Sequence, residues 1–198
     1  MEVQGNMVPM VIEQTGRGER AYDLWSRMMK DRIIFISGGI NDDNANITVA
    51  QLLFLQSEDA EKEISIYINS PGGVCTAGLA VIDAMKFVKC PVATYCVGQA
   101  ASMGAVILAA GTKGRRFSLP SSRIMIHQPW GGAEGMATDM EIQVKEIVRI
   151  KTQLIEILAE ATGKTAKVLE RDMDRDLFLS AKESVSYGLI DGIVGKKK

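Results

Sequence analysis

Strand-like and helix-like patterns alternate through the middle of the chain, and this order constrains the fold more than any other feature. Short apolar runs predict buried strands, whereas apolar residues three and four positions apart predict helices. Along the chain we expect a strand at 32–37, a helix at 47–55, a strand at 64–68, a helix at 76–88, a strand at 92–97 and a helix at 102–110. Alternation of this kind builds α/β layers.

After these units the pattern predicts two short strands, at 116–119 and 123–127, and one long helix at 137–161. Apolar residues follow two separate stripes of that helix. The main stripe holds Met140, Val144, Ile147, Val148, Leu154, Ile155 and Leu158, and the second holds Ile142, Ile150 and Ile157. With 198 residues the chain fits one domain, 1–198, which can cover only one stripe. We therefore hypothesise that self-association covers the other.

Charge and cysteine content exclude several classes of function. Lys and Arg number 23 against 24 Asp and Glu, so no field favours nucleic acid or an acidic membrane surface. Cys75, Cys90 and Cys96 lack metal-ligand spacing and are odd in number, so we expect no disulfide framework, metal or cofactor. Residues 1–6 lack a secretion signal, and no apolar run is long enough to cross a bilayer. We expect a cytoplasmic protein with reduced thiols, and we interpret the lysines at 196–198 as a solvated tail.

His127 is the only histidine, so any mechanism with a Ser–His or Cys–His pair must use it. It ends a predicted strand two residues before Pro129, where a side chain can stand over the edge of a sheet. The alternative interpretation is a histidine without a catalytic role.

Ser102 follows a predicted strand and the small-residue turn 98–101, and it opens a helix that is apolar all round. The free N–H groups at a helix start would stabilise an alkoxide or an oxyanion there. The alternative is an ordinary N-cap serine. Because the spacing is not Gly-x-Ser-x-Gly, the nucleophile elbow of the α/β-hydrolases is not supported.

A turn at 69–73 follows the second predicted strand, and Pro71 and Gly72 suit the two central positions of a type II turn. Its glycines could aim free amides into a cavity and let an extended peptide lie close, as an oxyanion hole requires. Taken alone, the motif favours the other interpretation, a purely structural turn.

A catalytic histidine needs a third group that orients it, and Asp172, Asp174 and Asp176 crowd one segment near the C-terminal end. The residue pattern leaves all three open, and a charge cluster is also typical of a solvated face. Ser180 and Glu183 have the spacing of a capping box, which explains them by a helix start.

Four segments taken together resemble the proteolytic subunit of the Clp protease. They read NSPGG at 69–73, GQAASMGA at 98–105, MIHQP at 125–129 and DLFLSA at 176–181, and the similarity runs from 8 to 194. The resemblance implies a crotonase-like α/β fold. It also implies that Ser102 is the nucleophile, His127 the general base and Asp176 the orienting carboxylate of a serine endopeptidase.

The resemblance implies backbone roles as well. The oxyanion amides map onto Gly73 and Met103, and the substrate is expected to add as a strand between two edges. Those edges map onto Gly73, Val74 and Cys75 on one side and onto Pro129, Trp130 and Gly131 on the other. Trp130 is bulkier than many residues at this edge, and Cys75 replaces an aliphatic residue, so cleavage preference stays open.

Assembly is also implied by the resemblance. Family members stack two seven-membered rings around a chamber, with 130–161 matching the handle that joins them and 1–19 matching a leader and pore-loop segment. A Clp-type AAA+ ATPase feeds unfolded polypeptides to the chamber. Its docking pockets map onto Leu53, Tyr67, Phe87, Tyr95 and Val194.

Two other functions compete with this one. A crotonase-like acyl-CoA hydratase or isomerase would share the fold and the oxyanion amides but need no Ser–His pair. A non-catalytic ring subunit would lack a member of the triad, whereas Ser102, His127 and Asp176 are all present.

Overall fold

The computed structural model describes residues 8–16 and 18–195. Its described part is built on one seven-stranded sheet and a separate two-stranded hairpin. The strands of the large sheet are β3 (Ile33–Ser37), β4 (Ile64–Ser70), β5 (Val92–Ala101), β6 (Arg116–Ser118), β7 (Arg123–Ile126), β8 (Leu177–Ser180) and β9 (Gly192–Ile193). The helices that follow them are α2 (Asp42–Glu58), α3 (Cys75–Phe87), α4 (Met103–Ala109), α5 (Ala137–Thr162), α6 (Ala166–Asp172) and α7 (Ala181–Tyr187). The predicted α/β alternation is therefore confirmed.

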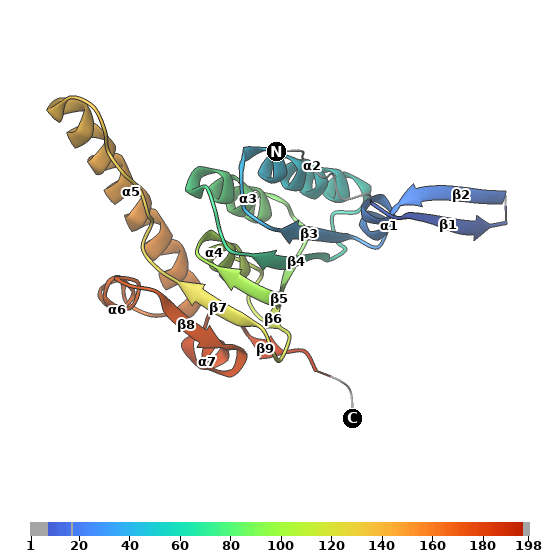
Figure 1. Ribbon diagram of the computed structural model, residues 1–198. Coiled ribbons are helices and arrows are strands. Elements are labelled where there is room, and N and C mark those ends of the chain that lie inside the picture. The colour runs from blue at the N-terminus through green and yellow to red at the C-terminus, as the bar shows by residue number, and fades with distance from the viewer. Residues whose placement is uncertain (1–7, 17, 196–198) are drawn as a thin grey trace.

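The strands lie in the order β3-β4-β5-β6-β9, and β7 pairs with both β5 and β8. All of these pairs are parallel except β7 with β8. The carboxyl ends of β4, β5 and β7 therefore meet at one edge of the sheet (Figure 1). Ligands bind at the carboxyl ends of strands in open α/β sheets, so this edge is the first place to look for a site.

Side chains alternate between the two faces of the sheet. Ile34 and Ile66 point into a core shared with α2, α3 and α4, and both are at most 1% exposed. On the opposite face Phe35, Tyr67, Tyr95 and Phe117 occupy paired positions on four neighbouring strands. Their rings stack in one row, with neighbouring ring centroids 4.7 to 5.3 Å apart. Helices thus cover one face, and an aromatic row marks the other.

The small-residue turn predicted at 98–101 is wrong, because β5 continues as a strand through Ala101. The backbone of this segment is held on both sides: Ala100 pairs with β4, and Gln99 to Ala101 pair with β7. Gly98 has φ 75°, and the register with β4 shifts beside it. The glycine bends β5 rather than ending it, which lets β6 and β7 pair with successive parts of the same strand.

Helix α5 projects away from the sheet (Figure 1). Its C-terminal half packs in the core, where Leu154 and Leu158 are buried. Its N-terminal half leaves large apolar side chains exposed: Met140, Ile142, Val144 and Val148. Ile150 and Ile157 instead pack against the core. The predicted division into one stripe that the domain covers and a second that it leaves uncovered is therefore wrong. Apolar residues of both stripes are exposed in the N-terminal half of the helix and covered in its C-terminal half.

At the other end of the molecule a hairpin of β1 (Met10–Thr15) and β2 (Gly18–Asp23) extends from the body and leads into α1 (Leu24–Lys30) (Figure 1). The predicted leader and pore-loop segment at 1–19 lies partly outside the described residues, as does the basic tail at 196–198. Within the described ranges, no helix has both the length and the apolar character that spanning a membrane takes.

Candidate active site

Ser102 stands at the junction between β5 and α4 in a conformation that non-glycine residues rarely adopt. Its φ is 53° and its ψ is −125°, and among the described residues only Arg32 is another non-glycine with positive φ. The side chain makes no capping hydrogen bond within the described part of the chain, so the ordinary N-cap interpretation is wrong. A hydrogen bond from the Ser102 N–H to the Met125 carbonyl, 2.8 Å long, holds the strained junction against β7.

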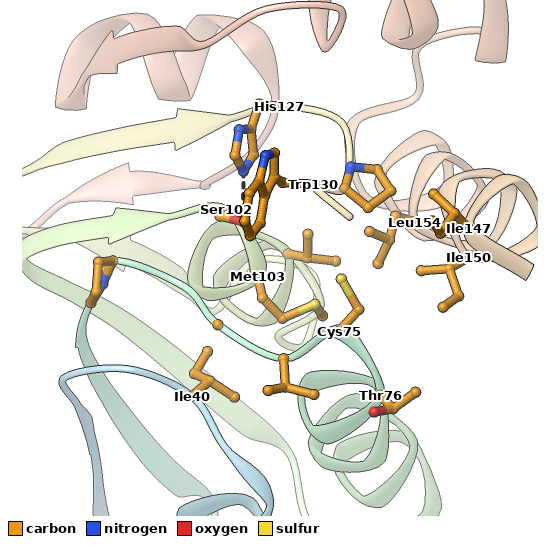
Figure 2. Close-up of a pocket in the computed structure, with 15 residues that line it drawn as sticks. Ile40, Cys75, Thr76, Ser102, Met103, His127, Trp130, Ile147, Ile150 and Leu154 are labelled. Carbon is orange, nitrogen blue, oxygen red and sulfur yellow. Dashed lines mark hydrogen bonds between the residues drawn. The ribbon is translucent and has the colours of Figure 1, made fainter. Parts of the chain in front are cut away.

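The Ser102 hydroxyl instead contacts the only histidine. Its Oγ lies 2.8 Å from His127 Nε2 (Figure 2). On the other side of the ring, His127 Nδ1 lies 3.0 Å from Asp176 Oδ1. Because a carboxylate only accepts, Nδ1 carries the ring proton, and the neutral ring then accepts the Ser102 proton at Nε2. Ser102 follows the end of β5, His127 follows the end of β7, and Asp176 lies in the loop directly before β8. This is the geometry of an activated nucleophile with an oriented base.

The three aspartates that the sequence left open have different partners. Asp172 Oδ1 accepts from the Arg171 guanidinium at 2.7 Å, and its Oδ2 accepts from the Tyr187 hydroxyl at 2.9 Å. Burial opposes ionisation of Asp172, but these hydrogen bonds outweigh it and lower the pKa of that carboxyl. Asp174 accepts from the Gln128 side chain. Asp176 alone of the three contacts His127.

The glycine turn lies directly against the serine. A Cβ added to Gly72 would lie 2.5 Å from Ser102 Cβ. The φ of Gly72 is 100°, which suits the third position of a type II turn. Next to it, Ile40 N–H donates to the Gly72 carbonyl and Val74 N–H donates to the Ile40 carbonyl. Backbone groups alternate in direction along such a bridge, so the Gly73 N–H and carbonyl point away from Ile40. Gly73 also lines the cavity that Ser102 lines.

A cavity of about 590 Å³ opens beside the Ser102 hydroxyl. Its walls are mostly apolar and come from the loop between β3 and α2, the glycine turn, α3, α4 and α5 (Figure 2). The apolar residues include Ile40, Val74, Met103, Val106, Ile147 and Leu154. The α5 residues were assigned to core or interface from the sequence, and only the fold shows that they form a cavity wall. Trp130 stands at the rim and is 93% exposed.

Cys75 lines the same cavity, yet its chemistry does not compete with that of Ser102. Burial raises the pKa of the Cys75 thiol, so the thiol stays protonated and weakly nucleophilic at neutral pH. Cys90 and Cys96 are free and buried. In the described residues, no group of three or more His, Cys, Asp or Glu side chains is arranged to hold a metal ion.

The five residues predicted to form the docking surface for an ATPase do not line this cavity. Tyr67 and Tyr95 are the central pair of the aromatic row on the far face of the sheet. Leu53, Phe87 and Val194 are exposed by 42%, 73% and 40% respectively. The structure brings the two tyrosines into contact, and the other three present apolar side chains at the surface.

A strained serine at a strand–helix junction, hydrogen-bonded to a histidine that a carboxylate orients, defines the class of serine hydrolases with an α/β fold. Comparison with known families makes the class narrower. A family model described as Clp protease matches residues 16–197. The chain therefore belongs to the Clp protease family and is a serine peptidase with the crotonase-like fold of that family.

Proposed function

We propose that the chain, as one domain 1–198, is a serine endopeptidase subunit in which Ser102 attacks the peptide carbonyl and His127 accepts its proton. One observation carries the proposal: Ser102 Oγ lies 2.8 Å from Nε2 of the only histidine, at a junction whose strain aims the hydroxyl at that ring. Asp176 holds the imidazole in the tautomer that accepts at Nε2 and stabilises the imidazolium that forms.

The chemistry proceeds through an acyl-enzyme. Ser102 Oγ bonds to the carbonyl carbon, and the oxyanion accepts hydrogen bonds from the Gly73 and Met103 amides. Support for these donors is that Gly73 lines the cavity with its N–H turned away from Ile40, and that Met103 is the first residue of α4, whose N–H has no partner within the helix. His127 then gives its proton to the leaving amine, and water hydrolyses the ester in a second cycle.

The substrate is an extended peptide that adds as a strand between two backbone edges. One edge is Gly73, Val74 and Cys75, and the other is Pro129, Trp130 and Gly131. Support comes from the cavity lining, which includes residues of both edges together with Ser102 and His127. Because that lining is mostly apolar, the side chain that enters the cavity is apolar.

The working particle is proposed to be two stacked heptameric rings in the cytoplasm. The N-terminal half of α5, with four large exposed apolar side chains, supports a further contact between subunits through the handle 130–161. A Clp-type AAA+ ATPase docks on Leu53, Tyr67, Phe87, Tyr95 and Val194 and supplies unfolded polypeptide. This surface is supported by the exposed apolar side chains of Phe87 and Leu53, which come from the neighbouring helices α3 and α2.

The two alternatives are weaker. A crotonase-like acyl-CoA enzyme would have no use for a serine held in a strained conformation against a histidine. A non-catalytic ring subunit would have no reason to keep the complete Ser102–His127–Asp176 arrangement.

Hydrolysis of a short fluorogenic peptide by Ser102→Ala, His127→Ala and the double variant tests the proposal. We expect each single variant to lose about 10⁴-fold or more in kcat, and the double variant to be little worse, because the pair acts as a unit. Asp31→Asn, a change of an exposed carboxylate on another part of the surface, is the control. Near-normal hydrolysis by either single variant would remove the proposed mechanism.

A further inference from the structure

Gln128 belongs to the segment that carries His127. It is hydrogen-bonded to the segment that carries Asp176 and to the handle helix α5. It directly follows His127 in the chain. Its backbone N–H donates to the Met173 carbonyl at 2.7 Å, and its side-chain Nε2 donates to the Asp174 carbonyl at 3.0 Å. Two adjacent carbonyls of the segment that leads to Asp176 are thereby fixed to the residue after the histidine.

The remaining polar atom of this side chain points to α5. Lys151 Nζ donates to Gln128 Oε1 at 3.0 Å, in a partly buried position. A hydrogen bond from an ammonium group is stronger than one between neutral groups, and it polarises the amide so that its N–H becomes a better donor. Lys151 thus strengthens the bond from Gln128 to Asp174 and fixes which way the carboxamide faces.

The relation to the catalytic geometry is direct. The triad of the proposed function needs His127 and Asp176 at hydrogen-bond distance, and they come from different loops. The Asp176 side chain is 55% exposed and lies between a short turn and the first residue of β8, so few neighbouring side chains hold it in place. Strands β7 and β8 pair as far as Ile126 and Leu177, which directly flank the two catalytic residues. The connection through Gln128 ties the same two segments on the other side of that pair, without the catalytic side chains themselves.

We propose that Gln128 is a positioning residue for the triad and that Lys151 acts through it, so that the handle helix sets the alignment of His127 with Asp176. The inference rests on the proposed function of Ser102, His127 and Asp176. It concerns the transition state and not the binding of peptide, because Gln128 fixes the base while other residues form the cavity.

Gln128→Met removes the donor and the acceptor while it keeps the length of the side chain. We expect kcat for a short peptide to fall about 10- to 100-fold with KM within about twofold, since a misplacement of about 1 Å near the chemistry costs rates of that order. Lys151→Met should cost less, about three- to tenfold, and Lys151→Arg should restore most of the loss. The double variant should be no slower than Gln128→Met alone, because Lys151 acts through Gln128.

Gln153→Met is the matched control. It is the same substitution, on the helix that carries Lys151, at a glutamine whose buried Oε1 has no hydrogen-bond partner in the described residues. All variants are prepared as the full chain in its assembled form, and their thermal unfolding midpoints are compared with that of the control. If Gln128→Met does not fold, the Lys151→Met and Lys151→Arg pair carries the test.

The rate at which a peptide phosphonate labels Ser102 separates the inference from the function on which it rests. Absence of labelling in the unmodified protein would overturn the proposed function. The positioning role alone would be overturned if the unmodified protein is labelled normally and Gln128→Met or Lys151→Met hydrolyses peptide, and is labelled, as fast as Gln153→Met. A raised KM at unchanged kcat, or losses that add in the double variant, would overturn it as well.

Discussion

Gly72 lies against Ser102, the proposed nucleophile, at a distance that leaves no room for a side chain, and replacing Gly72 with alanine tests the importance of this close contact. A Cβ at this position would lie 2.5 Å from Ser102 Cβ and 2.9 Å from the Ala101 carbonyl oxygen, whereas ordinary contacts begin near 3.4 Å. The turn or the serine must therefore move by about 1 Å. A displacement of that size at a reacting group costs about 100-fold in rate. We expect Gly72→Ala to lower kcat/KM for a short peptide by at least that factor.

The same substitution also strains the backbone, and Gly114→Ala isolates that contribution. Gly114 has φ 83°, close to the 100° of Gly72, but an added Cβ would meet nothing within 4 Å. Each alanine should cost about 1 to 2 kcal/mol of stability from its positive φ. Gly114→Ala should keep normal hydrolysis and a normal phosphonate labelling rate.

Peptide hydrolysis, labelling of Ser102 and urea denaturation are measured on both variants side by side. Equal activity of Gly72→Ala and Gly114→Ala would refute the reasoning, because it would mean that the glycine turn does not limit where the serine stands. A Gly72→Ala protein that is less stable than Gly114→Ala by several kcal/mol yet fully active would refute it too.

Three further outcomes are expected. Asp176→Asn should lower kcat by about 10³- to 10⁴-fold, whereas Asp172→Asn should change stability and leave kcat within a few fold; the reverse order in peptide assays would contradict the hydrogen bonds described above. The buried Arg116 guanidinium donates to Asp191 Oδ1 at 2.6 Å and to Asp191 Oδ2 at 2.9 Å. Burial opposes ionisation of Asp191, but these hydrogen bonds outweigh it and hold the pKa of that carboxyl below the ordinary 3.8. The ionised Asp191 thus contributes its full stabilisation above about pH 4, and this stabilisation is lost as the pH falls through the lowered pKa of Asp191 in the folded protein. Asp191→Asn should therefore lower the free energy of unfolding in urea by about 3 kcal/mol at pH 7 and by progressively less in acid. Val144→Glu should reduce particle size in analytical ultracentrifugation and Gln143→Glu should not, and two particles of equal size would show that the exposed half of α5 is not an interface.

The sequence predicts the alternating core well because its signals are local. Apolar runs such as 64–68 and capping patterns such as Ser180 with Glu183 are decided by neighbouring residues, and the structure has both the strand and the capping box. The continuation of β5 through 98–101 was missed because small residues have weak strand propensity, and pairing with two neighbouring strands overrides it. Such long-range pairing leaves no local signal.

The residues of the candidate site also divide into those that the sequence could single out and those that it could not. The sole histidine and the serine at a predicted helix start could be chosen from the sequence, and the family resemblance chose Asp176. The residue pattern alone could not distinguish Asp176 from Asp172 and Asp174, because the three differ only in the hydrogen-bond partners that the fold brings to them. The sequence could not suggest the positioning role proposed for Gln128 either, since that role depends on contacts with Asp174 and Lys151, which are distant in the chain.

The identity of the nucleophile is the central claim, and covalent labelling tests it most directly. The purified full-length protein is treated with a peptide phosphonate, digested, and the modified residue is located by mass spectrometry. We predict a single adduct on Ser102, and almost none in the His127→Ala protein, because the hydroxyl needs its base. An adduct on another residue, or full labelling of Ser102 without His127, would contradict the account.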